Sequence, residues 1–207
     1  MRYSLLRVTD DGVVLSALHE RRLAPDGGED RAAFARFAAE AEPGVWAVRV
    51  EGGALRCERR GLSRLWDGMP ARHAVSPCAG MRGTFPKPAP PCVYDGVRAE
   101  GVATLLTWTD EAEILESCSA AVLGWDGERF LCVPEDRPRV WSTAEQAVRA
   151  HLSFREERLA VGGDTPLLLV NAVKGPCTIA APGRRPFPPQ AIRDIEELFA
   201  RLTERVG

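Results

Sequence analysis

Lysine is scarce in this chain of 207 residues: 25 of its 27 basic residues are arginine, and only Lys87 and Lys174 are lysine. A guanidinium group stays charged, whereas a lysine amine can lose its proton, attack a carbonyl carbon and form a Schiff base. So strong a bias towards arginine indicates that a remaining lysine stands where arginine cannot serve. Lys87 is therefore a candidate for covalent chemistry. The alternative is an exposed loop residue between two prolines.

Long apolar runs and basic tracts are also missing. No segment approaches the ~18 apolar residues of a membrane span, and the N-terminus has neither the apolar core nor the cleavage-like site of a signal peptide. Acidic and basic residues are mixed along the chain, the net charge is −2, and no basic stretch indicates a nucleic-acid-binding face. We therefore expect a cytoplasmic protein that binds neither membrane nor nucleic acid.

The six cysteines contain no C-x-x-C pair, and the three histidines lie far apart in the sequence. This spacing fits neither a zinc site nor a compact disulfide scaffold. We expect no metal and reduced, mostly buried thiols. Hydrophobic residues at 45% and charged residues at 27% are ordinary for a globular protein.

The first 80 residues predict a small α+β domain. The expected elements are strands over 2–8 and 13–18 around a turn at 10–12, a helix over 29–42, and a hairpin over 45–60 with Gly52-Gly53 at its tip. The segment 62–86 is rich in proline, glycine and arginine and could hold a domain junction. We set the boundary between residues 80 and 81.

Residues 81–207 predict a larger, strand-rich domain with peripheral helices. Expected elements are a short helix over 94–102, a turn at 110–111, and strands over 103–108, 113–125, 129–136, 166–173 and 177–181. Ser142 predicts the N-cap of a helix over 143–154, with Glu145 completing a capping box. Pro189 begins a final amphipathic helix that extends to residue 202. The predicted fold class is therefore mixed α+β.

In their order along the chain, four residues resemble the functional residues of the class IV family of pyridoxal-phosphate enzymes (fold type IV): Arg22, Lys87, Tyr94 and Glu116. This family includes branched-chain aminotransferases, D-amino-acid aminotransferases and aminodeoxychorismate lyase. The H-x-x-R-L motif containing Arg22 is similar to the motif whose arginine contacts the cofactor phosphate. Lys87, with Tyr94 seven residues later, matches the lysine that holds the cofactor and the tyrosine beside it. Glu116 stands at the position of the acid that faces the pyridine nitrogen.

Two further segments resemble the family's phosphate-binding elements. Ser142-Thr143 falls where a helix N-terminus binds the phosphate, and N-A-V-K-G at 171–175 is similar to the second phosphate loop, especially in the lyase branch. Free N–H groups and the helix dipole suit such a group, and a nearby arginine adds charge. The resemblance implies as catalytic residues Lys87, Tyr94 and Glu116, and as cofactor-binding residues Arg22, Lys87, Tyr94, Glu116, Ser117, Ser142, Thr143, Asn171 and Ala172.

Each motif taken alone also has a structural interpretation. Arg22 could form a salt bridge on a hairpin, and Glu116 could be an exposed acid on an edge strand. Tyr94 could pack in the core, Ser142 could only cap a helix, and Asn171 could close a turn. The combined order of the motifs favours the family.

The resemblance implies transfer of an amino group between an amino acid and a 2-oxo acid, with pyridoxal 5′-phosphate as cofactor, a small amino-acid-like substrate and a homodimer. The close alternative is a 4-amino-4-deoxychorismate lyase, which forms 4-aminobenzoate and pyruvate. A second alternative is a non-catalytic homologue that serves as a binding subunit. It draws support from the run Pro-Ala-Pro-Pro-Cys at 88–92, where the family usually has a polar segment. No local signature favours a cysteine-based hydrolase.

Overall fold

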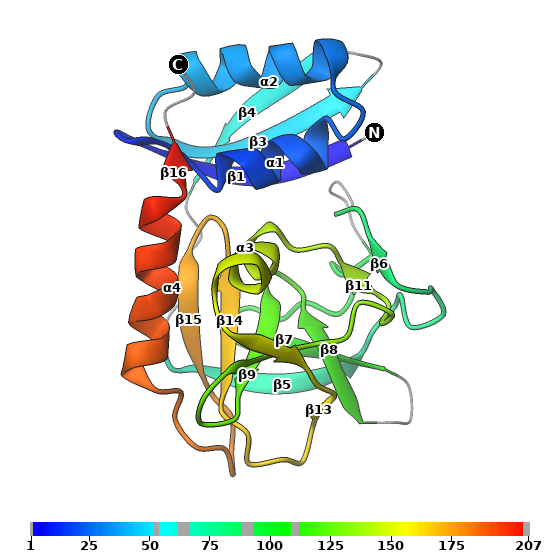
Figure 1. The fold of residues 1–207 in the computed structure, drawn as a ribbon. Coiled ribbons are helices and arrows are strands. Elements are labelled where there is room, and N and C mark those ends of the chain that lie inside the picture. The colour runs from blue at the N-terminus through cyan, green and yellow to red at the C-terminus, as the bar shows by residue number, and fades with distance from the viewer. Residues whose placement is uncertain (1, 52–53, 62–66, 88–92, 109–111, 205–207) are drawn as a thin grey trace.

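The computed structural model describes residues 2–51, 54–61, 67–87, 93–108 and 112–204 (Figure 1). In this part of the chain four helices combine with two sheets and a two-stranded ribbon. The predicted mixed α+β class is confirmed. The predicted tip at Gly52-Gly53 and the predicted turn at 110–111 lie outside the described residues.

A five-stranded antiparallel sheet forms the upper part of Figure 1. Its strands, in spatial order, are β16 (Thr203–Glu204), β2 (Gly12–Val14), β1 (Arg2–Thr9), β3 (Gly44–Glu51) and β4 (Ala54–Arg60). Two helices, α1 (Ser16–Leu23) and α2 (Gly28–Glu40), pack on it through Leu23 and Phe34. Side chains alternate along β1, so Leu6 and Val8 face these helices, whereas Tyr3 and Leu5 face the rest of the molecule.

A nine-stranded mixed sheet forms the lower part. Its order is β12 (Phe154–Glu156), β10 (Phe130–Cys132), β9 (Ala121–Trp125), β14 (Leu167–Asn171), β15 (Gly175–Ala180), β5 (Met69–Val75), β7 (Ala103–Trp108), β8 (Glu113–Ser117) and β13 (Leu159–Ala160). Beside it, β6 (Thr84–Phe85) and β11 (Arg139–Val140) pair in parallel as a short ribbon.

Two helices, α3 (Thr143–His151) and α4 (Pro189–Arg201), cover one face of this sheet. The apolar run of β14 serves both faces: Leu168 and Val170 pack in the cluster that contains α3 and α4. Leu167 and Leu169 pack in a second cluster with residues of β5, β7 and β8. Burial on both sides explains why the strand is continuously apolar rather than alternating.

Three predicted elements differ from the structure. The strand expected over 13–18 ends at Val14, because Leu15 adopts a left-handed conformation (φ 57°) and α1 begins at Ser16. The helix expected over 94–102 is absent from these described residues, where turns connect to β7. The long strand expected over 113–125 is two strands, since Ser117 and Ala120 close a tight turn between β8 and β9.

The predicted domain boundary between residues 80 and 81 stays a prediction, and the two sheets do not follow it. Strand β5 precedes this boundary but pairs with β7 and β15 in the nine-stranded sheet. Strand β16, near the end of the described chain, pairs with β2 in the five-stranded sheet. The chain thus enters the larger sheet before residue 80 and returns to the smaller one after α4.

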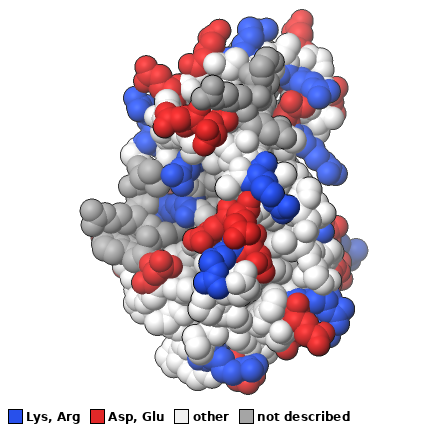
Figure 2. All heavy atoms as spheres, turned by 60° about the vertical axis from the view of Figure 1, so that its left-hand side comes forward, with Lys and Arg blue, Asp and Glu red and all other residues white. Residues whose placement is uncertain are grey.

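No helix in the described part of the chain is long and apolar enough to cross a membrane. Acidic and basic side chains are interspersed on the face shown in Figure 2. The five cysteines that the structure describes are free thiols, of which Cys78, Cys132 and Cys177 are buried.

Candidate functional site

A cavity of about 270 Å³ lies between β1 and α1 of the smaller sheet and the loops of the larger one. All nine residues singled out from the sequence line it: Arg22, Lys87, Tyr94, Glu116, Ser117, Ser142, Thr143, Asn171 and Ala172. They come from segments far apart in the sequence, and the fold brings them to one place. Their individual roles stay predictions.

Glu116 projects from β8 and is buried, in contrast to the exposed edge-strand acid of the structural alternative. Its carboxylate accepts a hydrogen bond from the Tyr94 hydroxyl at 2.6 Å and lies 3.1 and 3.2 Å from the Val140 N–H donor. Burial raises the pKa of Glu116 to about 7, although these hydrogen bonds act in the opposite direction. Burial and the neighbouring Glu116 raise the pKa of Tyr94 far above its ordinary value. The pair therefore forms a buried acid held at fixed geometry.

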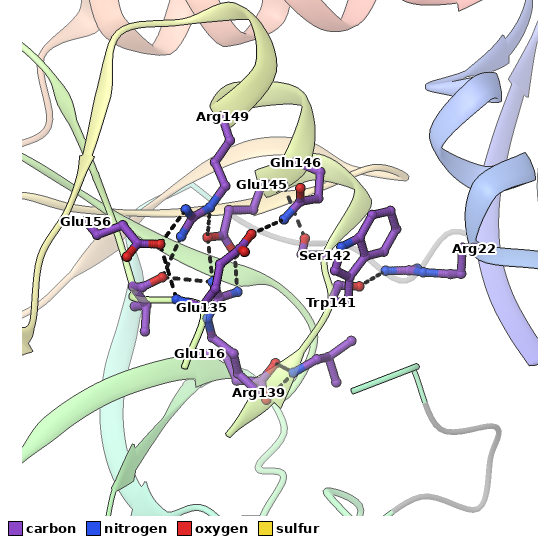
Figure 3. Close-up of polar contacts among 12 residues, drawn as sticks. Arg22, Glu116, Glu135, Arg139, Trp141, Ser142, Glu145, Gln146, Arg149 and Glu156 are labelled. Atoms are coloured by element: carbon purple, nitrogen blue, oxygen red, sulfur yellow. Dashed lines mark hydrogen bonds and ion pairs between the residues drawn. The ribbon is translucent and has the colours of Figure 1, made fainter. Parts of the chain in front are cut away.

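A buried ion network supports the Val140 donor (Figure 3). Arg139, directly before Val140, binds both carboxylate oxygens of Glu145, with Nη2 at 2.9 Å from Oε1. Arg149 binds the same carboxylate at 2.8 Å and also reaches Glu156 at 2.8 Å. We call Arg139, Glu145, Arg149 and Glu156 the Arg139 network. Because it joins β11 to α3, it fixes the acid's hydrogen-bond donor and the start of α3 together.

The N-terminus of α3 opens into the cavity through Ser142 and Thr143. The Ser142 hydroxyl accepts a hydrogen bond from Glu145 N–H at 3.3 Å, as predicted for an N-cap. The predicted capping box is wrong, because the Glu145 carboxylate binds Arg139 and Arg149 instead. The first intrahelical bond runs from Gln146 N–H to the Ser142 carbonyl, so the N–H groups of the first turn before it have no intrahelical acceptor.

Arg22 reaches this helix start from α1. Its guanidinium donates to the Trp141 carbonyl, lies over the Trp141 ring and donates to the Ser4 hydroxyl at 3.4 Å. Its Nε atom is buried without a hydrogen-bond partner, and no carboxylate of the described residues lies within ion-pair distance. Burial lowers the pKa of Arg22 to about 10. A desolvated cation beside a helix N-terminus is a favourable place for an anion.

His19 stands one helical turn before Arg22, on the same side of α1. Its Nδ1 lies 2.7 Å from the Ser4 hydroxyl, which also accepts the bond from Arg22. Burial first, then the positive charges of Arg22 and Lys87, hold the pKa of His19 well below its ordinary value. His19 is therefore uncharged in the folded protein, and it takes no part in the salt bridge considered for this motif.

Lys87 follows β6 and is half-buried. The β6–β11 ribbon aligns Phe85 with Val140, and the Trp141 N–H donates to the Phe85 carbonyl at 2.8 Å. The β6–β11 ribbon thus positions both Lys87 and the Val140 N–H that donates to Glu116. The Lys87 amine lies 5.8 Å from the centre of the Tyr3 ring. The proline-rich run at 88–92 lies outside the described residues.

Asn171 closes its own turn, since its side-chain oxygen accepts a hydrogen bond from Val173 N–H at 2.8 Å. Its amide also donates to the Ser119 carbonyl, and the Ser117 hydroxyl binds the backbone of Ala120. These bonds connect the turn after Glu116 to the loop at 171–174. The structural interpretation of Asn171 is therefore correct, and the same residue lines the cavity.

Sequence reasoning missed several residues that also line the cavity: Tyr3, Asp95, Arg98, Cys118 and Lys174. Both lysines and both tyrosines of the chain are thus in one site. The scarcity that drew attention to Lys87 applied equally to Lys174. The described residues contain no group of three or more histidine, cysteine or acidic side chains able to hold a metal ion.

No protein-family profile matches the chain, and no curated protein does. Several solved structures, by contrast, match the chain. A pyridoxal-phosphate-bound structure described as a hypothetical aminotransferase from Mycobacterium tuberculosis aligns with 98% of this chain and 88% of its own, at 20% identity and a TM-score of 0.63. The 4-amino-4-deoxychorismate lyase from Pseudomonas aeruginosa aligns with 97% and 90%, at 14% identity and 0.61. A fold IV-transaminase from Curtobacterium pusillum aligns with 97% and 84%, at 16% identity and 0.57.

These likenesses cover nearly the whole of both chains, so the predicted resemblance to fold type IV is confirmed at the level of the fold.

Proposed function

We propose that this protein is a pyridoxal-phosphate-dependent enzyme of fold type IV that transfers an amino group between an amino acid and a 2-oxo acid. One observation carries the proposal: the residues that this chemistry requires, drawn from distant parts of the sequence, line a single cavity. A fold alone hosts many functions, whereas a converged set of chemical groups is specific.

The cavity fits the cofactor's phosphate. Arg22 supplies a buried cation whose Nε lacks a partner, and the first turn of α3 supplies N–H groups beside Ser142 and Thr143. Arg22 already binds the Trp141 carbonyl, directly before Ser142, so the two phosphate-binding elements are adjacent. A phosphate here would neutralise Arg22 and satisfy groups that the protein leaves open.

The cavity also fits the pyridine ring. Pyridoxal phosphate supplies an electrophilic carbon and an electron sink that eases bond breaking at the substrate α-carbon. Glu116 keeps the ring nitrogen protonated by accepting its hydrogen bond. Tyr94 and the Val140 N–H hold the carboxylate in place for this task.

Lys87 is the covalent attachment point and the base. With the cofactor bound, Lys87 would be its covalent attachment point through Nζ, and the freed amine would accept the proton of the substrate α-carbon at Nζ. Tyr3 and Leu5 of β1 form the opposite side of the cavity and help to exclude water.

We propose that the protein is a homodimer, because the resemblance to the family implies that a second subunit completes the active site. The lyase stays the alternative reaction: the first proton transfer serves both, and the loop at 171–175 lines the cavity. Formation of 4-aminobenzoate from 4-amino-4-deoxychorismate would identify the lyase, whereas transfer to a 2-oxo acid would identify the aminotransferase.

The deciding experiment adds pyridoxal phosphate to the purified protein, reduces it with borohydride and maps the modified peptide by mass spectrometry. We expect the cofactor to be fixed on Lys87. The only other lysine, Lys174, lines the same cavity, so peptide mapping decides which of the two amines the cofactor binds. Lys87→Ala should abolish the labelling. Equal labelling of both lysines, or labelling that survives Lys87→Ala, would contradict the assignment, and absence of labelling at saturating cofactor would support the non-catalytic binding subunit.

A further inference from the structure

A second cationic group lines the cavity, and none of the roles proposed above uses it. It consists of Lys174, in the turn between β14 and β15, and Arg98, in the segment before β7; we call it the Lys174 group. Lys174 is half-buried, and no carboxylate of the described residues lies within ion-pair distance of its amine. Burial lowers the pKa of Lys174, Cys177 acts in the opposite direction, and the positive charge of Arg98 makes a smaller lowering contribution.

The Lys174 group is distinct from the cations around Arg22. The two groups are connected to different parts of the backbone. Arg22 is bonded to the start of α3, whereas Arg98 donates to the Cys118 carbonyl in the turn that follows β8. The cavity therefore contains two cationic groups held by different elements.

The charges of the Lys174 group are only partly compensated. Arg98 forms an ion pair with Asp95 at 3.7 Å, and both side chains are about half exposed. Lys174 has no such partner among the described residues. In the proposed function Arg22 and the start of α3 hold the cofactor's single phosphate, so Lys174 is available for another anion.

We propose that Lys174 binds a free carboxylate of the substrate and thereby selects amino acids and 2-oxo acids over amines that lack a carboxylate. This inference rests on the proposed function for the identity of the substrate, and it names the residue that recognises it. Arg98 assists by adding positive potential, and Asp95 limits that contribution. Lys174 is thus a specificity-determining residue, separate from the covalent role of Lys87.

A single charged hydrogen bond in a partly desolvated site accounts for a large effect. Charge-assisted bonds are stronger than neutral ones, and removal of one partner typically changes affinity by roughly 10- to 100-fold. A lysine is a compact point charge, and Arg in its place would keep the charge but change its geometry. We therefore expect Lys174→Gln to weaken carboxylate binding by roughly this factor and Lys174→Arg to restore part of it.

The test separates the carboxylate from the cofactor. Calorimetry measures 2-oxoglutarate binding to cofactor-free protein in saturating inorganic phosphate, which occupies the Arg22 end of the cavity. Pyridoxal phosphate affinity is measured separately. Lys174→Gln should weaken only 2-oxoglutarate binding. Arg36→Gln removes an exposed positive charge on α2 and is the matched control. It should leave both affinities unchanged.

Two results would overturn the inference: unchanged 2-oxoglutarate affinity in Lys174→Gln, or a loss confined to pyridoxal phosphate, which would assign Lys174 to the phosphate. Failure of the proposed function is distinguishable, because it appears as absent cofactor labelling of Lys87 and does not depend on 2-oxoglutarate. In the active enzyme, Lys174→Gln should also reduce the preference for phenylalanine over 2-phenylethylamine, a pair that differs only in the carboxylate.

Discussion

The two sides of the cavity differ in how far their buried polar and charged groups are paired. On the α3 side, the Arg139 network pairs every carboxylate with a guanidinium, and Glu116 receives hydrogen bonds from Tyr94 and Val140. On the α1 side, His19 Nε2 and Arg22 Nε are buried without a hydrogen-bond partner. Arg139 Nε on the α3 side is also unpaired, but both Nη atoms of Arg139 bind the Glu145 carboxylate, whereas Arg22 has no carboxylate partner among the described residues. Burying a polar group without a hydrogen bond is costly, so the α1 side is incomplete as it stands. The difference indicates that the α3 side is built by folding and the α1 side is completed by a ligand.

The comparison predicts that the largest loss of stability comes from the α3 side. Glu145→Ala leaves Arg139 and Arg149 without their shared carboxylate, and Arg139 is almost fully buried. Breaking a buried pair by removing one partner costs about 3–5 kcal/mol of unfolding free energy. Denaturant unfolding of the cofactor-free protein measures it.

Glu156→Ala is the matched control, because it removes another carboxylate bound to Arg149 whose side chain is 44% exposed. A partly exposed ion pair of this kind contributes at most about 1 kcal/mol. If both variants lost the same free energy, the burial of the Arg139 network would not be the source of its stability.

The next effect concerns Glu116 and pH. The pKa of its carboxyl is about 7 in the folded protein, against 4.5 for an ordinary glutamate, so the folded state holds a proton that the unfolded state releases. Stability from this group is therefore present below about pH 4.5 and is lost as pH rises to about 7. Linkage gives a total of about 3 kcal/mol. Glu116→Gln should abolish this part of the pH dependence.

His19 acts in the opposite direction, because burial lowers its pKa and protonation at acidic pH favours the unfolded state. The informative quantity is therefore the difference in unfolding free energy between the wild type and Glu116→Gln at each pH. A difference that stays constant from about pH 4.5 to about pH 7 would show that Glu116 does not titrate in this range.

The α1 side should respond differently to mutation. Arg22→Met removes a half-buried cation that has no carboxylate partner among the described residues, so the cofactor-free protein should keep or gain stability. Affinity for pyridoxal phosphate should fall by roughly 10- to 100-fold, since charged hydrogen bonds to the phosphate are lost. Unfolding with and without the cofactor measures both effects.

Arg21→Met is the control for Arg22→Met. Arg21 also lies over the Trp141 ring but is exposed and does not line the cavity. It should change neither stability nor cofactor affinity appreciably. Equal effects of the two variants would mean that stacking on Trp141, and not an anion site, explains Arg22.

The sequence predicted the strongly patterned elements of the fold. The apolar run of β14, the amphipathic α4 after Pro189 and the Ser142 cap are all found. The start of α1 was not predictable from pattern, because V-V-L-S-A-L reads as a continuing strand and only the left-handed Leu15 ends it. Tertiary contacts decided that point, since the Leu15 N–H donates to the carbonyl of Leu202 at the other end of the chain.

The candidate site was predictable where a rare residue or a spaced motif marked it, as for Lys87 and Arg22. The supporting residues carried no such mark. Arg139 is one of 25 arginines, and nothing local distinguishes a fully buried guanidinium from an exposed one. Glu145 was assigned to a capping box, a local rule, but two arginines compete for its carboxylate. Lys174 had the same scarcity as Lys87 and stood within the N-A-V-K-G segment, but that segment was assigned to the phosphate through Asn171 and Ala172, so its lysine received no role of its own.

The smallest expected effect concerns Ser142, where the two sides of the cavity meet. Its hydroxyl caps α3 by accepting the Glu145 N–H, and it lines the cavity beside the Arg22 contact at Trp141. Ser142→Ala should cost about 1 kcal/mol of unfolding free energy, the usual contribution of an N-cap. Ser142→Asp keeps a capping oxygen and should leave stability nearly unchanged.

Ligand affinity should rank these two variants in the reverse order. The aspartate's negative charge would face the anion, so Ser142→Asp should weaken pyridoxal phosphate binding more than Ser142→Ala does. Calorimetry with the cofactor and denaturant unfolding without it give the two rankings from the same proteins. If affinity followed stability, Ser142 would act only as a helix cap. Opposite rankings would instead mean that Ser142, which stabilises the α3 side by capping the helix, also faces the ligand that completes the α1 side.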